Sequence, residues 1–185
     1  DEPAIWAVLD MPPVRVNVDG WRTMAVEHAT KAQTIADAVG FNPGSYPQTK
    51  TALKKVMGRA PKDTKALTLQ SLLVGAPDSA QDLLRSILEY RMYKKASSTY
   101  GERWLDENIE EGDLVYSGWR VTGAETGRMS SRGPNLQQIP ARRIPKFRDM
   151  FIPRKKRFIV ADVIQQEPRI AAWWSKDSVL LDILT

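Results

Sequence analysis

The hydrophobic pattern of the chain changes near residue 113, and this change constrains the fold more than any other feature of the sequence. Before it, apolar residues recur at steps of three and four, which is typical of amphipathic helices. After it, Val115 to Val121 is rich in aromatic and β-branched residues and fits a period of two, which is typical of strands. The sequence therefore predicts an α+β protein, with a helical part at residues 1–112 and a strand-containing part at residues 113–185.

Four helices are expected in the first part. One spans residues 21–39, where His28 packs among apolar neighbours and Gly40 provides a stop. A short helix begins at Ser45, which forms a capping box with Gln48, and ends at Gly58. Another short helix lies within residues 62–74. A long helix starts near Ser79 and ends in a basic and hydroxyl-rich stretch at about Thr99.

The second part combines a polar loop with a strand and a helix. Residues 126–140 are crowded with hydrogen-bonding side chains and contain little that packs. Phe158 to Ala161 is an apolar run that predicts a buried strand ending at Asp162. Residues 165–176 predict a helix that tolerates Pro168 in its first turn. Asp162 is therefore expected where a strand gives way to a helix.

Positive charge is concentrated in one segment. The formal net charge is +5, yet residues 142–157 alone carry eight basic residues against Asp149. The eight are Arg142, Arg143, Lys146, Arg148, Arg154, Lys155, Lys156 and Arg157. This concentration favours a polyanionic partner, and the alternative is a solvated loop or sheet edge.

Composition excludes several kinds of chemistry. The chain has no Cys and a single His, which rules out disulfides, thiolate zinc, cysteine nucleophiles and histidine metal clusters. No apolar run approaches the roughly 18 residues of a membrane helix, and Asp1 to Asp10 lacks a secretory pattern. We expect a cytoplasmic protein without a membrane partner, whose chemistry rests on carboxylates, hydroxyls, amides and basic groups.

Asp162 is the candidate for that chemistry. Magnesium prefers oxygen ligands, commonly one or two carboxylates together with phosphate oxygens of a substrate. Two such ions about 3.5 to 4 Å apart bind the attacking and leaving oxygens of a phosphoryl transfer. The alternative is that Asp162 caps the N-terminus of the helix behind it.

Five segments match the motifs of one protein family in the family's order. Val14 to Asp19 is similar to GV.VD, and Phe41 to Gln48 is similar to FNPxSxxQ. Leu88 to Tyr100 is similar to LEYRxxxKxxSTY, and Thr126 to Pro140 is similar to TGRLSSxxPNLQNIP. Arg148 to Arg169 is similar to RxxFxP…ADYSQIELR. On these motifs the chain resembles the family A, or DNA polymerase I-like, DNA polymerases over nearly its whole length.

The resemblance implies a fold and a reaction. The helical part corresponds to the thumb with a preceding connector, and residues 113–185 to the N-terminal half of the palm, an antiparallel sheet with a strand-Asp-helix unit. The implied reaction is nucleotidyl transfer from a dNTP to a primer 3′-hydroxyl with two Mg²⁺ ions. The implied partners are primer-template DNA and a dNTP, in a bacterial or phage-infected cell.

The resemblance also implies residue roles. Asp162 and the main-chain carbonyl of Val163 would bind the metal ions, and Glu167 and Gln165 would lie at the nucleotide. Arg128 would contact the minor groove at the primer terminus. Further contacts to DNA would come from Ser130, Ser131, Asn135, Gln137, Lys94, Lys95, Ser98, Thr99 and Arg148.

The chain also departs from the family pattern. Val163 and Ile164 replace Tyr-Ser after the aspartate, and Gln166 and Pro168 resemble variants of phage-type members. The family's fingers helix and second catalytic aspartate have no match here. We therefore expect a polymerase piece that is inactive alone and is completed by a second polypeptide. The alternative is a non-catalytic module that binds primer-template duplex.

Overall fold

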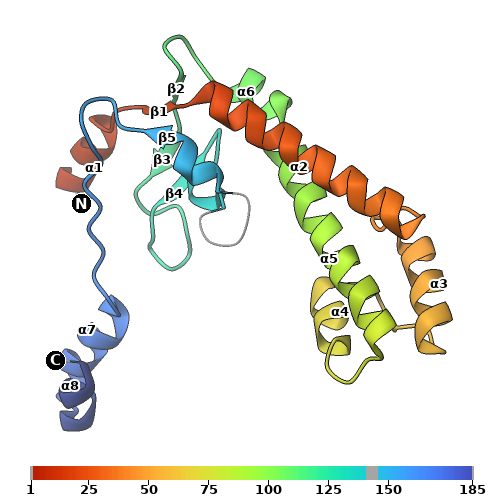
Figure 1. Ribbon diagram of the computed structural model, residues 1–185. Coiled ribbons are helices and arrows are strands. Elements are labelled where there is room, and N and C mark those ends of the chain that lie inside the picture. Colours follow the sequence, from red (N-terminus) through yellow and green to blue (C-terminus); the bar gives the residue numbers. More distant parts are fainter. Residues whose placement is uncertain (1, 141–145, 185) are drawn as a thin grey trace. The chain divides into compact units, whose positions relative to one another are not determined.

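The computed structural model describes residues 2–140 and 146–184, which fall into two compact units (Figure 1). The first unit ends at Arg154 and the second begins at Lys155. The predicted basic residues Arg142 and Arg143 lie outside the described residues. The predicted boundary at residue 113 stays a prediction, because contacts within the first unit join both sides of it.

A pair of long helices dominates the first unit, and the sequence predicted both. Helix α2 (Val18–Val39) and helix α5 (Asp78–Thr99) lie side by side (Figure 1). Small residues such as Ala25 and Ala32 are buried along α2, which lets the two helices approach closely. The left-handed conformation of Gly40, with φ of 75°, ends α2 where the sequence placed the stop.

Two short helices pack against α5 beyond the end of α2. They are α3 (Tyr46–Met57) and α4 (Ala66–Leu72), both within the predicted segments. Their contact with α5 is a small core of Leu53, Leu69, Leu84 and Ile87. The predicted capping box is wrong: Ser45 makes no side-chain cap, and Oε1 of Gln48 accepts a hydrogen bond from the Asn42 amide at 2.8 Å instead.

The strands of the first unit are short and antiparallel. Strand β1 (Val14–Val16) is central, with β2 (Leu114–Val115) on one side and β5 (Phe151–Ile152) on the other. A separate pair consists of β3 (Gly118–Arg120) and β4 (Ser130–Arg132). Strand β1 thus joins residues from before and after position 113 in one sheet, and the α+β class is confirmed.

An aromatic core connects the sheet to the helices. The ring of Trp21 is fully buried, stacks on Trp104 with centroids 4.2 Å apart, and contacts Phe147 at 4.8 Å. Trp104 lies on α6 (Glu102–Asn108), and Phe147 begins the short 3-10 helix η2 (Phe147–Met150). Another 3-10 helix, η1 (Leu136–Gln138), and the N-terminal helix α1 (Glu2–Leu9) complete the described elements of this unit.

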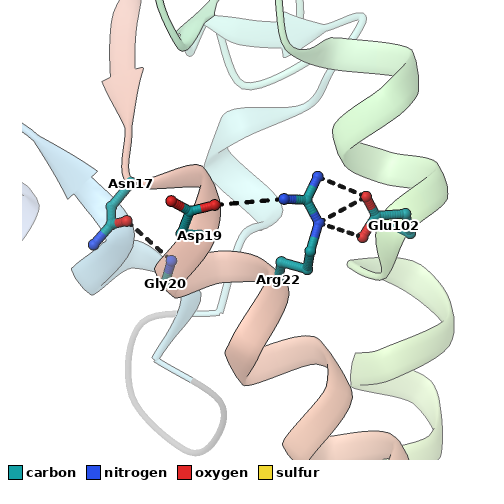
Figure 2. Close-up of polar contacts among 5 residues, drawn as sticks. All are labelled: Asn17, Asp19, Gly20, Arg22 and Glu102. Carbon is teal, nitrogen blue, oxygen red and sulfur yellow. Dashed lines mark hydrogen bonds and ion pairs between the residues drawn. The ribbon is translucent and has the colours of Figure 1, made fainter.

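A polar contact reinforces the same junction at the surface. Figure 2 shows the guanidinium of Arg22 on α2 donating to both carboxylate oxygens of Glu102 on α6, at 2.8 and 2.9 Å from Nε. The same guanidinium reaches Asp19 at 3.5 Å. At the helix start, the Asn17 side chain accepts a hydrogen bond from the Gly20 amide at 2.9 Å. The cap marks where α2 begins, and the ion pair links α2 to α6.

The second unit contains α7 (Gln166–Ser175) and α8 (Ser178–Leu184). Helix α7 confirms the predicted helix, but the predicted strand over Phe158 to Ala161 is not formed, and these residues have no regular secondary structure. Ile159 is 92% exposed and Val160 88% exposed. A strand requires a neighbour to accept and donate its backbone hydrogen bonds, and no described residue of the chain pairs with this segment.

Candidate nucleic-acid interface

Arg128 extends from a tight turn that leads into β4. The Ala124 amide donates to the Arg128 carbonyl at 3.2 Å, and the Gly127 amide donates to the Ala124 carbonyl at 2.9 Å. Gly127 has φ of 74°, a conformation that favours glycine. The Arg128 side chain is exposed. The turn therefore fixes the backbone of Arg128 and presents its guanidinium at the surface.

The polar residues that follow Arg128 bond mainly to one another. Ser131 is only 3% exposed, and its hydroxyl accepts a hydrogen bond from the Leu136 amide at 3.0 Å. The Gln137 side chain accepts from the Ser131 amide and donates to the Met129 carbonyl, both at 3.1 Å. Oδ1 of Asn135 caps η1 by accepting from the Gln137 amide at 3.1 Å. These side chains shape the loop, while Ser130 is half-buried in β4.

Arg148 joins the same loop to η2. Its Nε donates to the Ile139 carbonyl at 2.8 Å, and its Nη2 donates to the Gln137 carbonyl at 2.9 Å. The hydroxyl of Tyr100 donates to the Gln138 carbonyl at 3.0 Å. Burial raises the pKa of that hydroxyl, so Tyr100 stays protonated and remains a donor at neutral pH. The loop is thus held by Tyr100, which directly follows α5, and by Arg148 of η2.

The end of α5 exposes a polar face. Lys94, Lys95, Ser98 and Thr99 are all exposed and recur at four-residue steps, so they share one side of the helix. Tyr93 and Ala96 point into the protein on the other side. The structure brings together the four helix residues that the resemblance assigned to phosphate contacts.

A second basic segment, which sequence reasoning missed, comprises α3 and the residues that follow it. Residues 46–65 contain six basic residues and one acid, Asp63. The six, called here the tip cations, are Lys50, Lys54, Lys55, Arg59, Lys62 and Lys65. All but the half-buried Lys50 are exposed, and none is in an ion pair with another described residue. Counting charge in short windows along the helical part reveals them.

Asp162 lies in the irregular segment before α7 and is exposed. The N-terminal cap residue of α7 is Gln165, in a left-handed conformation with φ of 53°, so the capping role considered for Asp162 does not occur in this structure. No described residue makes a hydrogen bond or ion pair with the Asp162 carboxylate. Val163 is 60% exposed, and Glu167 is exposed in the first turn of α7.

The metal site expected around Asp162 is incomplete within the part of the chain that the structure describes. No group of three or more His, Cys, Asp or Glu side chains in these residues is placed to hold an ion. Two magnesium ions need more carboxylate oxygens than one aspartate provides. The described residues therefore do not by themselves fit a two-metal centre.

No helix in the described residues has the length and apolar character needed to cross a membrane.

Of the predicted basic run, Arg154, Lys155, Lys156 and Arg157 are exposed at the junction of the two units. Lys146 is exposed beside η2. These five described cations remain available to a polyanion.

Comparison with known proteins gives a consistent result. The family model for DNA polymerase family A matches residues 20–185. DNA polymerase I of Bacillus subtilis is 32% identical over 185 residues, covering 93% of this chain and 21% of that protein. DNA polymerase I of Aquifex aeolicus is 36% identical over 132 residues, covering 70% of this chain and 20% of that protein.

A solved structure supports the same relationship. The POL domain of Pol1 from M. smegmatis, in complex with DNA primer-template and dNTP, matches with a TM-score of 0.67 and 26% sequence identity. The match covers 92% of this chain and 32% of that one. The chain thus spans about a fifth of the length of these curated relatives and a third of the solved chain.

Proposed function

Because the chain belongs to DNA polymerase family A, we propose that it binds primer-template duplex and contributes Asp162 to template-directed DNA synthesis. The observation that carries the proposal is the structural match, over 92% of this chain, to a polymerase domain in complex with primer-template and dNTP. The proposed reaction is nucleotidyl transfer from a dNTP to a primer 3′-hydroxyl.

Duplex binding is assigned to two described surfaces. Lys94, Lys95, Ser98 and Thr99 on α5 would contact phosphates, which positions a duplex without reading its sequence. Arg128 would donate to minor-groove acceptors of the terminal base pair, and these are nearly the same for all pairs. Such indifference to sequence is what a copying enzyme requires.

The roles at the nucleotide rest on the segment before α7. We propose that the Asp162 carboxylate and the Val163 carbonyl are two of the magnesium ligands, and that Glu167 and Gln165 lie at the incoming nucleotide. When bound, magnesium would supply charge neutralisation at the phosphates. The remaining ligands and the fingers would come from polypeptide outside these 185 residues, and a second polypeptide is the arrangement we propose.

Complementation tests the catalytic assignment. The chain is mixed with a polypeptide that carries polymerase fingers and the second catalytic aspartate, and extension of a labelled primer is measured with Mg²⁺ and dNTPs. We expect extension with the wild-type chain and none with Asp162→Ala. The matched control is Asp182→Ala, which removes an exposed carboxylate of α8 in the same unit. Extension that survives Asp162→Ala would reject the proposed role.

The second candidate is a non-catalytic module that grips duplex DNA. It is favoured by the absence, among the described residues, of a group of three or more candidate ligands for a metal ion, and by the replacement of Tyr-Ser with Val163 and Ile164. Both candidates predict duplex binding that weakens about a thousandfold between 50 and 200 mM salt if about six phosphates are contacted. Only the catalytic candidate predicts magnesium-dependent incorporation of nucleotides when the chain is mixed with the complementing polypeptide.

A further inference from the structure

Ser117, which has no assigned role so far, lies in the connection between β2 and β3 at the centre of a hydrogen-bonded cluster. Its hydroxyl oxygen is 2.6 Å from the Ser131 hydroxyl, 2.8 Å from the Pro134 carbonyl and 3.3 Å from the Arg132 carbonyl. The Ser131 hydroxyl is also 3.2 Å from the Pro134 carbonyl. Two serines fourteen residues apart therefore share one carbonyl acceptor.

Both protons of this serine pair have an acceptor within the cluster, whichever serine donates to the other. A hydroxyl carries one proton and two acceptor lone pairs. One proton joins the two hydroxyls, and the other reaches the Pro134 carbonyl from whichever serine does not donate to its neighbour. The Leu136 amide donates to Ser131 in both arrangements. Because the cluster is satisfied in either direction, the Ser117 hydroxyl is committed to the protein rather than to a bound ligand.

The cluster connects Ser117 to the backbone of Met129, the residue that follows Arg128. Ser131 donates its amide to Oε1 of Gln137, and Nε2 of the same side chain donates to the Met129 carbonyl. Met129 directly follows Arg128, whose own carbonyl accepts from the Ala124 amide. The chain of bonds from Ser117 through Ser131 and Gln137 thus ends at the carbonyl of the residue that follows the exposed arginine.

We infer that Ser117 is a positioning residue for duplex binding, acting through Ser131 and Gln137 to hold Arg128 where its guanidinium meets the minor groove. The inference rests on the proposed function and adds to it a residue that does not touch DNA. Ser117 is half-buried and its hydroxyl bonds lie within the loop. Its effect on affinity is therefore indirect and depends on Arg128.

The test is a double-mutant cycle on duplex affinity. Dissociation constants of the 185-residue chain for a labelled primer-template duplex are measured by fluorescence anisotropy at fixed low salt. We expect Ser117→Ala to weaken binding about three- to tenfold, the worth of one net hydrogen bond. In an Arg128→Ala background the same change should cost less than about twofold, because the two residues act as a unit.

Three further variants separate positioning from general loss of structure. Ser117→Thr keeps the hydroxyl and should restore affinity, whereas Ser117→Cys, a weak donor of similar size, should behave like Ser117→Ala. If Ser117→Ala does not fold, the Cys and Thr variants carry the comparison. The matched control is Ser86→Ala, whose hydroxyl donates to the Asp82 carbonyl within α5. It should leave affinity unchanged.

The outcomes separate the two proposals. Equal affinity of wild-type and Ser117→Ala chains, or additive losses in the cycle, overturns the role of Ser117 and leaves duplex binding intact. A Thr variant as weak as the Ala variant also overturns it. A wild-type chain that does not bind duplex at all overturns the proposed function, and the role of Ser117 with it.

Discussion

Arg91 on α5 shows how one side chain organises a region that secondary structure alone leaves open. Its guanidinium donates to the Pro43 carbonyl at 2.9 Å, to the Thr64 hydroxyl at 3.2 Å and to the Thr64 carbonyl. Burial lowers the pKa of Arg91, yet arginine remains charged at neutral pH. These bonds tie α5 to the turn before α3 and to the segment before α4.

We expect Arg91→Ala to lower the free energy of unfolding by about 2 to 3 kcal/mol, because two buried carbonyls lose a charged donor. Arg91→Lys should recover only part of the loss, since an ammonium lacks the planar fork. Urea denaturation measures both. Arg85→Ala, which removes an exposed arginine of the same helix, should change stability by less than about 0.5 kcal/mol. A similar loss of stability in Arg85→Ala and Arg91→Ala would contradict the proposed contribution of the Arg91 hydrogen bonds.

His28 is the one histidine of the chain, and it is buried as a neutral ring. It is 5% exposed, stacks on Tyr93 with centroids 5.3 Å apart, and has no hydrogen-bond partner at either nitrogen among the described residues. Burial lowers the pKa of His28 below 6.5, Lys31 lowers it further, and Glu27 opposes the shift. The expectation that His28 packs on α2 is confirmed.

The lowered pKa of His28 predicts a loss of stability in mild acid. Below pH 6.5 the unfolded chain binds a proton that the folded chain does not, so this contribution is complete above pH 6.5 and falls as pH decreases. The free energy of unfolding should drop by up to about 1.4 kcal/mol per pH unit until the folded histidine also titrates. In His28→Phe this component should disappear. If urea denaturation gives the same dependence of the free energy of unfolding on pH for the wild-type chain and His28→Phe, this role of the buried neutral ring is contradicted.

At the level of elements, the helices α2 to α5 were predictable, but the cap at the start of α3 was not. Helices α2 and α5 follow a hydrophobic period that runs over 22 residues each, which is a strong local signal. Ser45 illustrates the limit, because the Ser-x-x-Gln spacing of a capping box occurs without the cap. Whether Gln48 reaches Ser45 or Asn42 depends on how the turn folds back, which local spacing does not specify.

The tip cations on α3 give a prediction for salt dependence. If Lys54 and Lys55 each neutralise a phosphate, Lys54→Ala/Lys55→Ala should reduce the slope of log affinity against log salt by about two. Duplex titrations at several salt concentrations measure the slope. The control is Arg103→Ala, whose guanidinium is already paired with Glu107 at 2.6 Å and should leave the slope unchanged. If the slope is the same in the double variant and the wild-type chain, Lys54 and Lys55 do not contact the duplex.

For the whole molecule, the division into two units predicts a preferred site of proteolysis. Arg154, Lys155, Lys156 and Arg157 are exposed and lie outside any helix or strand at the boundary between the units. Limited trypsin digestion should cut there before it cuts after Lys54 or Lys55, because α3 must unfold locally to enter a protease. Mass spectrometry of early fragments measures the order. Cleavage within α3 at the same rate would contradict the division.

The predicted strand before Asp162 is not formed because no described residue pairs with it. Phe158 to Val160 has the composition of a buried strand, but composition does not supply a hydrogen-bonding neighbour. Within the described residues the three-stranded sheet consists of β1, β2 and β5. The apolar residues Ile159 and Val160 therefore stay exposed, and the role of Asp162 remains a proposal that complementation tests.

The sequence by itself determined elements that depend on neighbours along the chain: α2, α3, α4, α5 and α7, and the ordered motifs that identify the family, whereas α1 and α6 were not predicted. Only the tertiary structure decided which distant residues meet. It pairs Val14 with Val115, stacks Trp21 on Trp104, and places Ser117 against Ser131. The physical reason is that periodicity records which face of an element is buried, whereas the partner of that face is chosen by packing and hydrogen bonding across the fold.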